Sequence, residues 1–540
     1  MSWRNYLLLF LVGIAVTSLV AVFQDSPGYM DADYYYAGGL RLAEGYGFTE
    51  DILWNYLDNP AGLPHPSHAY WMPFASLVAA GGMIIAGSTT FGAAKLGFLL
   101  AAGLVAPLTA GLSYEITQRK ESAIFSGFLA AIPGFYLSYM GTTDVFGIYM
   151  LLGATWLLLA GRIIQSRSVR FPSIALQTFA LGLVSGLFHL SRADGLMWFA
   201  VGVLVIILKG VPSRNNPVPV RADASRNIWM VLSGLLAFGS GYLLIMAPWM
   251  ARNLSVFGSL LAPGGSRALW LTNYDQLFAY PPELVNPSHW WASGLGEIFR
   301  ARWGALGQNI QSALAVQGEI FLVPLVLLGL WHWRQDPRVR IGMLAWCGTL
   351  FVMTVLFPYV GWRGGFFHSG AAYQPLFWAV VPAGLDGFID WGRRARRWNV
   401  QQATQVFRAG LVGLAILLSI LVVQKKVYGS SLTDRIWDDS WLSYVGVEQT
   451  LRLHGVDSSA IVLVNNAPGY YVASQRPALS IPNGGPETTL EVARRYGVEY
   501  LLLEQNHPEG LTGLYEQPED QPGLRHWFSY EGIQVFHIER

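Results

Sequence analysis

The stretch MPFASLVAAGGMIIAG, residues 72–87, decides how the chain is threaded through a membrane. It is apolar but short and rich in glycine, whereas a helix needs about 20 mostly apolar residues to cross a bilayer. Whether it crosses sets the side on which every later loop lies. Other apolar runs, near the length of a membrane-spanning helix, occupy residues 6–23, 91–113, 122–140, 145–161, 173–190, 195–208, 228–250, 318–333, 341–358, 371–388 and 408–424.

Basic residues between these runs indicate that 72–87 does not cross. Without that crossing, one side of the membrane receives Arg4, Arg119, Lys120, Arg162, Arg167, Arg170, Lys209, Arg214, Arg221, Arg226, Arg334, Arg338, Arg340, Arg393, Arg394, Arg396, Arg397 and Arg408. The connections on the other side hold few: Arg41, Arg192, Arg252, Arg267, Arg300, Arg302 and Arg363. Because basic loops stay cytoplasmic, we expect 72–87 to be an interfacial or re-entrant helix and the chain to make about 11 spans.

This topology divides the chain into a membrane domain, residues 1–426, and a C-terminal domain, residues 427–540. We expect a multi-pass protein of the cytoplasmic membrane with a cytoplasmic N-terminus. Two large loops face outward, residues 24–90 (loop one) and residues 251–317, and so does the C-terminal domain. That domain alternates the apolar stretches AIVLVNN, EYLLLEQ and IQVFHIE with the helical stretch ETTLEVARRYGV. The alternation predicts a small soluble α/β fold.

Composition agrees with a membrane protein. Of the 540 residues 53% are hydrophobic and 13% charged, against roughly 25% charged in soluble domains. A net charge of +1 gives no sign of nucleic-acid binding. The single cysteine, Cys347, excludes disulfides within the chain and cysteine metal sites.

Ionisable residues gather at the outer boundary of the predicted spans. They are Asp31, Asp33, His65, His68, Asp144, His189, Arg192, Asp194, Arg252, Arg363 and His368. Charged groups near hydrocarbon are costly and are usually functional or paired. Carboxylates beside several arginines suit a site where an acidic side chain removes a proton and cations hold a phosphate.

Most of these residues also have a structural interpretation. Asp31 and Asp33 could be solvated loop residues, and Asp144 could cap the helix that follows it. Arg192 and Asp194 could pair at a tight turn, while Arg252 could extend to the interface beside a tryptophan. We expect His65 and His68 to be structural, although their spacing would also suit metal ligands.

Four stretches carry a family resemblance. They are MDADYYYAGGLRLAEGYGF (30–48), HPSHAYWMPFASLVAAGG (65–82), MGTTDVFGIYMLLG (140–153) and GLFHLSRADGLMWF (186–199). In this order they resemble the GT-C glycosyltransferases, above all the protein O-mannosyltransferase and aminoarabinose transferase group. The chain has no glycine-rich phosphate loop, nucleophile elbow or HExxH motif. An activated substrate would therefore have to arrive in the lipid.

The resemblance implies a polyprenyl-phosphate sugar donor, a hydroxyl acceptor on a protein, lipid or glycan, and an aspartate of loop one as base. That base falls on Asp31 or Asp33, and the distance to Gly45 favours Asp31. Arg192, Arg252 and Arg363 are candidates to bind the departing phosphate, and direct displacement would invert the anomeric centre. No cofactor is required, although Asp31, Asp33 and Asp144 could hold a divalent metal.

Two other classes stay open. A multispan transporter would show repeats and ionisable residues at the membrane midplane, and Lys95 is the notable such residue here. A non-catalytic envelope-assembly protein should tolerate the loss of a loop-one aspartate, which an enzyme should not.

Overall fold

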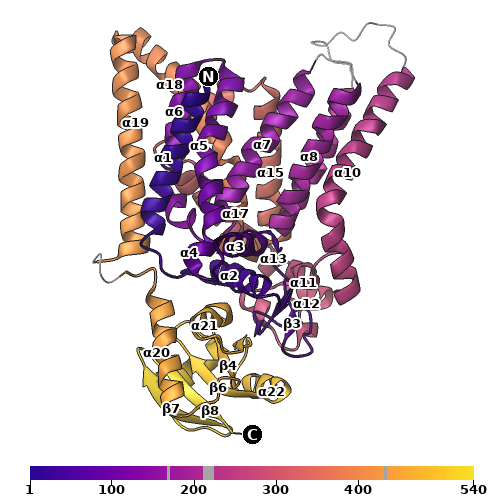
Figure 1. Ribbon diagram of the computed structural model, residues 1–540, viewed down its shortest axis with the longest axis vertical. Helices are drawn as coiled ribbons and strands as arrows, with labels where there is room; N and C mark the ends of the chain where they lie inside the picture. The colour runs from indigo at the N-terminus through magenta and orange to yellow at the C-terminus, as the bar shows by residue number, and fades with distance from the viewer. Residues whose placement is uncertain (167–170, 211–223, 431–434, 540) are drawn as a thin grey trace.

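A computed structural model gives the fold as a helical bundle with a small α/β domain at one end (Figure 1). It describes residues 1–166, 171–210, 224–430 and 435–539, so Arg167, Arg170, Arg214 and Arg221 of the predicted basic loops lie outside the described residues. The bundle comprises α1 (Trp3–Ala21), α5 (Leu96–Thr117), α6 (Lys120–Ala131), α7 (Phe146–Gln165), α8 (Phe171–Ser191), α9 (Leu196–Gly210), α10 (Ala224–Phe257), α14 (Val323–His332), α15 (Pro337–Phe351), α18 (Gln374–Arg396) and α19 (Val400–Val423).

Within the described residues, seven helices are long and apolar enough to cross a membrane. They are Trp3–Ala21, Phe91–Thr117, Phe146–Gln165, Ile174–Ser191, Ile228–Phe257, Pro337–Leu356 and Val400–Tyr428. Every apolar run predicted to span overlaps a helix of the bundle. The protein is therefore a helical membrane protein, while the count of about 11 spans and the orientation stay predictions.

The segment that decides the topology forms α3 (Phe74–Ala86), which is 13 residues long. At 1.5 Å per residue it extends about 20 Å, short of the roughly 30 Å hydrocarbon core. It packs on α2 (Met30–Ala43), where a Cβ on Gly39 would lie 2.7 Å from that of Ala79. Together with α4 (Phe91–Ala94), these helices lie at the end of the bundle next to the C-terminal domain (Figure 1). This length and position fit a helix that does not cross.

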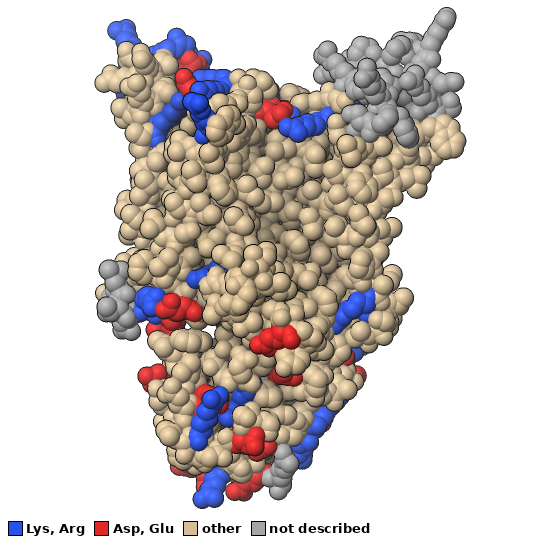
Figure 2. Space-filling model, in the orientation of Figure 1, with Lys and Arg blue, Asp and Glu red and all other residues tan. Residues whose placement is uncertain are grey.

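Charge separates along the molecule. Figure 2 shows a broad uncharged band between two ends that carry the charged side chains. At the end opposite the C-terminal domain, ion pairs join the bundle helices: Arg119 pairs with Asp386, and Arg338 with Glu115 at 3.1 Å. These arginines belong to the loops predicted to be cytoplasmic.

The C-terminal domain contains α20 (Asp439–Leu453), α21 (Ala467–Ser474), α22 (Pro486–Tyr496) and α23 (Thr512–Glu516). Its strands are β4 (Ile461–Val464), β5 (Ala478–Ser480), β6 (Val498–Leu503), β7 (Leu524–Tyr530) and β8 (Ile533–Ile538). The predicted α/β character is confirmed. The sheet order is β2-β5-β4-β6-β8-β7, and β2 (Ile52–Leu53) comes from loop one and runs parallel to β5. The sheet is thus not confined to the predicted range 427–540, because its edge strand lies more than 400 residues earlier in the chain.

Loop one is held together by a buried ion-pair cluster beside the pairing of β1 (Thr49–Glu50) with β3 (His65–Pro66). The His65 ring lies 3.0 Å from Asp58 and 3.4 Å from Glu50, and all three side chains are at most 10% exposed. Burial alone would lower the pKa of His65, but the two carboxylates raise it to about 9. His65 is therefore a structural cation of loop one.

The histidine cluster predicts a pH-dependent stability. Because its pKa is raised on folding, His65 contributes stability that is complete below its unfolded pKa of about 6.5 and is lost as pH rises through about 9. Thermal unfolding in detergent should show the melting temperature falling across this range. In His65→Gln the fall should be much smaller, and an unchanged slope would contradict the assignment.

Candidate active site

The first turn of α2 carries the two loop-one aspartates. Asp31 and Asp33 lie in the helix N-terminal turn, where backbone N–H groups favour negative charge. Residues two apart on an α-helix are rotated by about 200°. The two carboxylates therefore point to nearly opposite sides of α2 and enter different surroundings.

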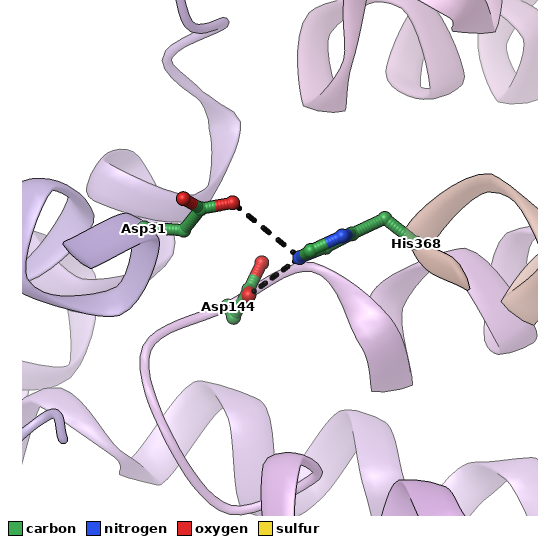
Figure 3. Close-up of side chains that lie close together, drawn as sticks. All are labelled: Asp31, Asp144 and His368. Carbon is green, nitrogen blue, oxygen red and sulfur yellow. Dashed lines mark hydrogen bonds and ion pairs between the residues drawn. The ribbon is translucent and has the colours of Figure 1, made fainter. Parts of the chain in front are cut away.

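Asp31 meets two residues from distant parts of the chain (Figure 3). His368 Nε2 lies 3.5 Å from an Asp31 oxygen and 3.1 Å from an Asp144 oxygen. Asp144 comes from the turn before α7, and His368 from α17 (Phe366–Gly370). One atom of each residue lies within 4.8 Å of the others, so three elements converge on one point.

The local backbone holds these side chains in place. A break in the helix before α17, where Gly364 has φ of +111°, brings the Gly364 carbonyl 2.9 Å from His368 Nδ1. Asp144 Oδ1 accepts from the Val145 N–H at 2.6 Å, and its Oδ2 accepts from the Tyr29 hydroxyl at 2.6 Å. Asp144 thus binds backbone at the start of α7 and also takes part in the cluster.

The three members of the cluster differ in access and in charge. The Asp144 side chain is fully buried, while that of Asp31 is 29% exposed. Burial raises the pKa of Asp31, although His368 partly offsets this. Burial would also raise the pKa of Asp144, but His368 and Tyr29 lower it overall. Burial lowers the pKa of His368, yet Asp144 raises it above its ordinary value. Asp31 is consequently the carboxylate that a substrate could reach.

The donor set also suits a divalent cation. When His368 Nδ1–H donates to the Gly364 carbonyl, the Nε2 lone pair faces the two carboxylates. Metal-bound histidines commonly donate their other ring N–H to a carbonyl in this way. Asp31, Asp144 and His368 could therefore hold a cation, or His368 could itself carry the positive charge between the two aspartates.

The predicted arginines lie in different places. Arg192 bonds Asp194 at 2.9 Å and is close enough to lower the pKa of Asp31. Arg363 is exposed and stacks on Tyr274, 4.6 Å from the ring centre. Arg192 is thus the predicted arginine that acts directly on Asp31, while Arg363 lies over Tyr274, a tyrosine whose pKa Asp31 raises.

Arg252 differs from its sequence-based placement. The predicted span ends at 250, but α10 continues to Phe257, so Arg252 lies within the helix and not in the loop beyond it. Its guanidinium donates to the backbone oxygens of Phe48 at 3.1 Å and Ser67 at 2.9 Å. In this position Arg252 ties loop one to α10.

The remaining candidates stay outside the cluster. His68 is buried between two serines, and burial lowers its pKa to about 3, so it is neutral. Asp194 is paired with Arg192. Asp33 faces the C-terminal domain, where the Asn466 side-chain N–H donates to it at 2.9 Å.

Sequence reasoning missed three tyrosines near Asp31. Tyr29 bonds Asp144, and Tyr70 and Tyr274 are close enough for Asp31 to affect their pKa values. Tyr70 belongs to loop one and Tyr274 to the segment 251–317, so both of these long segments reach the surroundings of Asp31. Tyr29 directly precedes the first quoted stretch and Tyr70 lies within the second, whereas nothing in the sequence around Tyr274 marks it.

The comparisons with known proteins bear on the fold. No family model and no curated protein matches the sequence. Among solved structures, the oligosaccharyltransferase AglB of Archaeoglobus fulgidus, in complex with an inhibitory peptide and a dolichol-phosphate, superposes with a TM-score of 0.53 at 12% identity. That match covers 93% of this chain and 70% of the other. The apo form of the A. fulgidus oligosaccharyltransferase superposes with a TM-score of 0.50 at 12% identity, and this match also covers 93% of this chain and 70% of the other.

The chain therefore shares its fold with these archaeal oligosaccharyltransferase structures, in agreement with the GT-C-like fold that the sequence resemblance predicts. The likeness to the protein O-mannosyltransferase and aminoarabinose transferase group in particular stays a prediction. At 12% identity the superposition defines the fold, and the chemistry has to be argued from the site.

The cluster predicts unequal costs of substitution. Asp144→Asn removes a fully buried partner of His368 and should destabilise the protein by about 3 kcal/mol. Asp31→Asn, at a partly exposed carboxylate, should cost less. Thermal unfolding of both variants measures the difference, and the double variant Asp144→Asn/His368→Gln should recover part of the loss. Equal costs for the two single variants would argue against this account.

Proposed function

We propose that this protein is a membrane glycosyltransferase that moves a sugar from a polyprenyl-phosphate donor to an acceptor hydroxyl on the outer face of the membrane. The observation that carries the proposal is the convergence of Asp31, His368 and Asp144 at one end of a GT-C fold, with Asp31 the accessible carboxylate. The dolichol-phosphate bound by the archaeal oligosaccharyltransferase supports a lipid-phosphate donor.

Asp31 is the proposed base. As the acceptor oxygen attacks the anomeric carbon, its O–H bond breaks and Asp31 takes the proton. The new bond joins the acceptor oxygen to the anomeric carbon. The bond from that carbon to the phosphate oxygen breaks, and its electron pair leaves with the polyprenyl phosphate. A single displacement of this kind inverts the anomeric centre.

Asp144 and His368 are proposed to hold Asp31 in position and to take no direct part in the proton transfer. His368 lies between the two carboxylates and keeps both charges compensated in a buried place. Because Asp144 is fixed by Tyr29 and by the Val145 N–H, it holds the imidazole against Asp31. Asp31 is left with one side open for the acceptor.

Arg192 and Arg363 are the proposed phosphate ligands. Negative charge grows on the phosphate as the sugar leaves, and preorganised cations stabilise such charge most where water is excluded. Arg192 bonds Asp194 through its Nε alone, and Arg363 is held over the Tyr274 ring. The position of Arg252 on loop-one carbonyls makes it the weakest of the three predicted ligands.

A divalent cation fits the same three residues. When bound, it would add positive charge next to the departing phosphate. Isothermal titration with Mn²⁺ should give a binding isotherm for the wild-type protein and none for Asp144→Asn or His368→Gln. Asp33→Asn is the matched control and should bind normally, because Asp33 faces away from the cluster. Wild-type protein that binds no Mn²⁺ would leave His368 as the cation of the site.

The function is tested by turnover of radiolabelled polyprenyl-phosphate sugars with crude membrane acceptors. Wild-type protein should transfer label. The transfer rate of Asp31→Asn should be lower by at least about a hundredfold, which is the usual contribution of a general base. The folding control is an unchanged melting profile of the variant. Full activity in a folded Asp31→Asn protein would reject Asp31 as the base. Failure of the wild type both to bind and to turn over any donor would reject the glycosyltransferase.

A further inference from the structure

In the C-terminal domain, one edge of the sheet faces loop one. It is the edge at which sheets of this kind usually bind ligands. Strands β5, β4 and β6 are parallel, so their carboxyl ends share one edge, which is where open α/β sheets bind ligands. Asn466 follows β4 and caps α21, because its Oδ1 accepts from the Gly469 N–H at 3.1 Å. What lies at this position is Asp33 of α2, whose Oδ2 accepts from Asn466 Nδ2 at 2.9 Å.

The fit around Asp33 is close. Asp33 is only 6% exposed. Its carboxylate lies at the N-terminal end of α21, where negative charge is favoured. A Cβ at position 469 would come within 2.8 Å of the Asp33 oxygen and 2.4 Å of Asn466 Nδ2. Only glycine leaves room there for the hydrogen bond between the two domains.

Contacts on both sides of α2 strengthen the same junction. Before the helix, Asp438 accepts from the Ser26 N–H at 2.9 Å and from its hydroxyl at 2.7 Å. After the helix, β2 joins the C-terminal sheet through Ile52 and Leu53. The C-terminal domain thus holds loop one upstream of α2, downstream of it, and within its first turn.

We propose that Asn466 is a positioning residue for the reaction and that the C-terminal domain is part of the catalytic unit. Asp33 and Asp31 share one rigid helical turn, so the bond from Asn466 to Asp33 sets the rotation of α2 and with it the direction of Asp31. Asp33 itself takes no proton from the substrate. This inference rests on the proposed role of Asp31.

Exchanging the two side chains tests the hydrogen bond directly. Asp33→Asn keeps an oxygen that can accept from Asn466, so transfer should stay within about threefold of wild type. Asn466→Asp still caps α21, since aspartate is as good a cap as asparagine. It has no N–H to offer and sets two carboxylates against each other. Its kcat should fall by at least about tenfold, with the donor KM little changed.

The double variant Asp33→Asn/Asn466→Asp reverses donor and acceptor and should recover kcat to within about threefold of wild type. Such rescue would not follow from a general loss of folding. Loss of activity in Asp33→Asn alone would instead make Asp33 a chemical participant. Failure of the double variant to recover, or an unaffected Asn466→Asp variant, would overturn the positioning role.

A second measurement separates this inference from the glycosyltransferase proposal. Hydrogen exchange of the peptides covering α2 and α21 reports the junction without any turnover. Exchange should rise in Asn466→Asp and return to the wild-type level in the double variant. If wild-type protein transfers no sugar but shows this pattern, the proposed function fails while the junction stands. If exchange does not respond to the substitutions, the junction is rejected whatever the activity.

Discussion

Asp31 and Asp33 point to opposite sides of one helix, because two successive residues turn an α-helix by about 200°. One face of α2 must meet a partner for Asp31, which α17 supplies with His368, itself paired with Asp144 from the turn before α7. The other face must meet a partner for Asp33, which the C-terminal domain supplies with Asn466. A short helix beside the membrane thereby joins the bundle to the soluble domain.

The energetic reason for so many contacts is the cost of burying charge. A carboxylate taken out of water is tolerated only where hydrogen bonds or opposite charges compensate it. Asp144 has Tyr29 and His368, and Glu50 has Tyr34 at 2.8 Å as well as His65. Asp438 has the backbone and hydroxyl of Ser26. Removing one partner leaves a buried charge uncompensated, so the network favours a single arrangement of loop one.

This chain shares its fold with the archaeal oligosaccharyltransferase at only 12% identity. The arrangement of the helices and the chemistry of the site therefore have to be argued separately. The arrangement of helices is retained because many apolar sequences satisfy the same bundle. Chemistry depends on a few side chains, and these have to be located in this chain individually. The proposed side chains come from α2, the turn before α7 and α17, with Arg192 close to Asp31.

The sequence alone determined the membrane class, the helical bundle and the α/β character of the C-terminal domain, and its resemblance to the GT-C glycosyltransferases agrees with the fold shared with the archaeal enzyme. Hydropathy and the placement of basic residues carry that information locally, and the length of 72–87 already argued against a crossing. The topology inferred from the basic residues also predicted that Asp31, Asp144 and His368 lie at one boundary. Only the tertiary structure decided which of Asp31 and Asp33 faces that cluster. It also showed that Ile52 and Leu53 complete a sheet more than 400 residues away, and that Asn466 holds Asp33. Such pairings join residues that lie far apart in the chain, and they leave no periodic pattern along it.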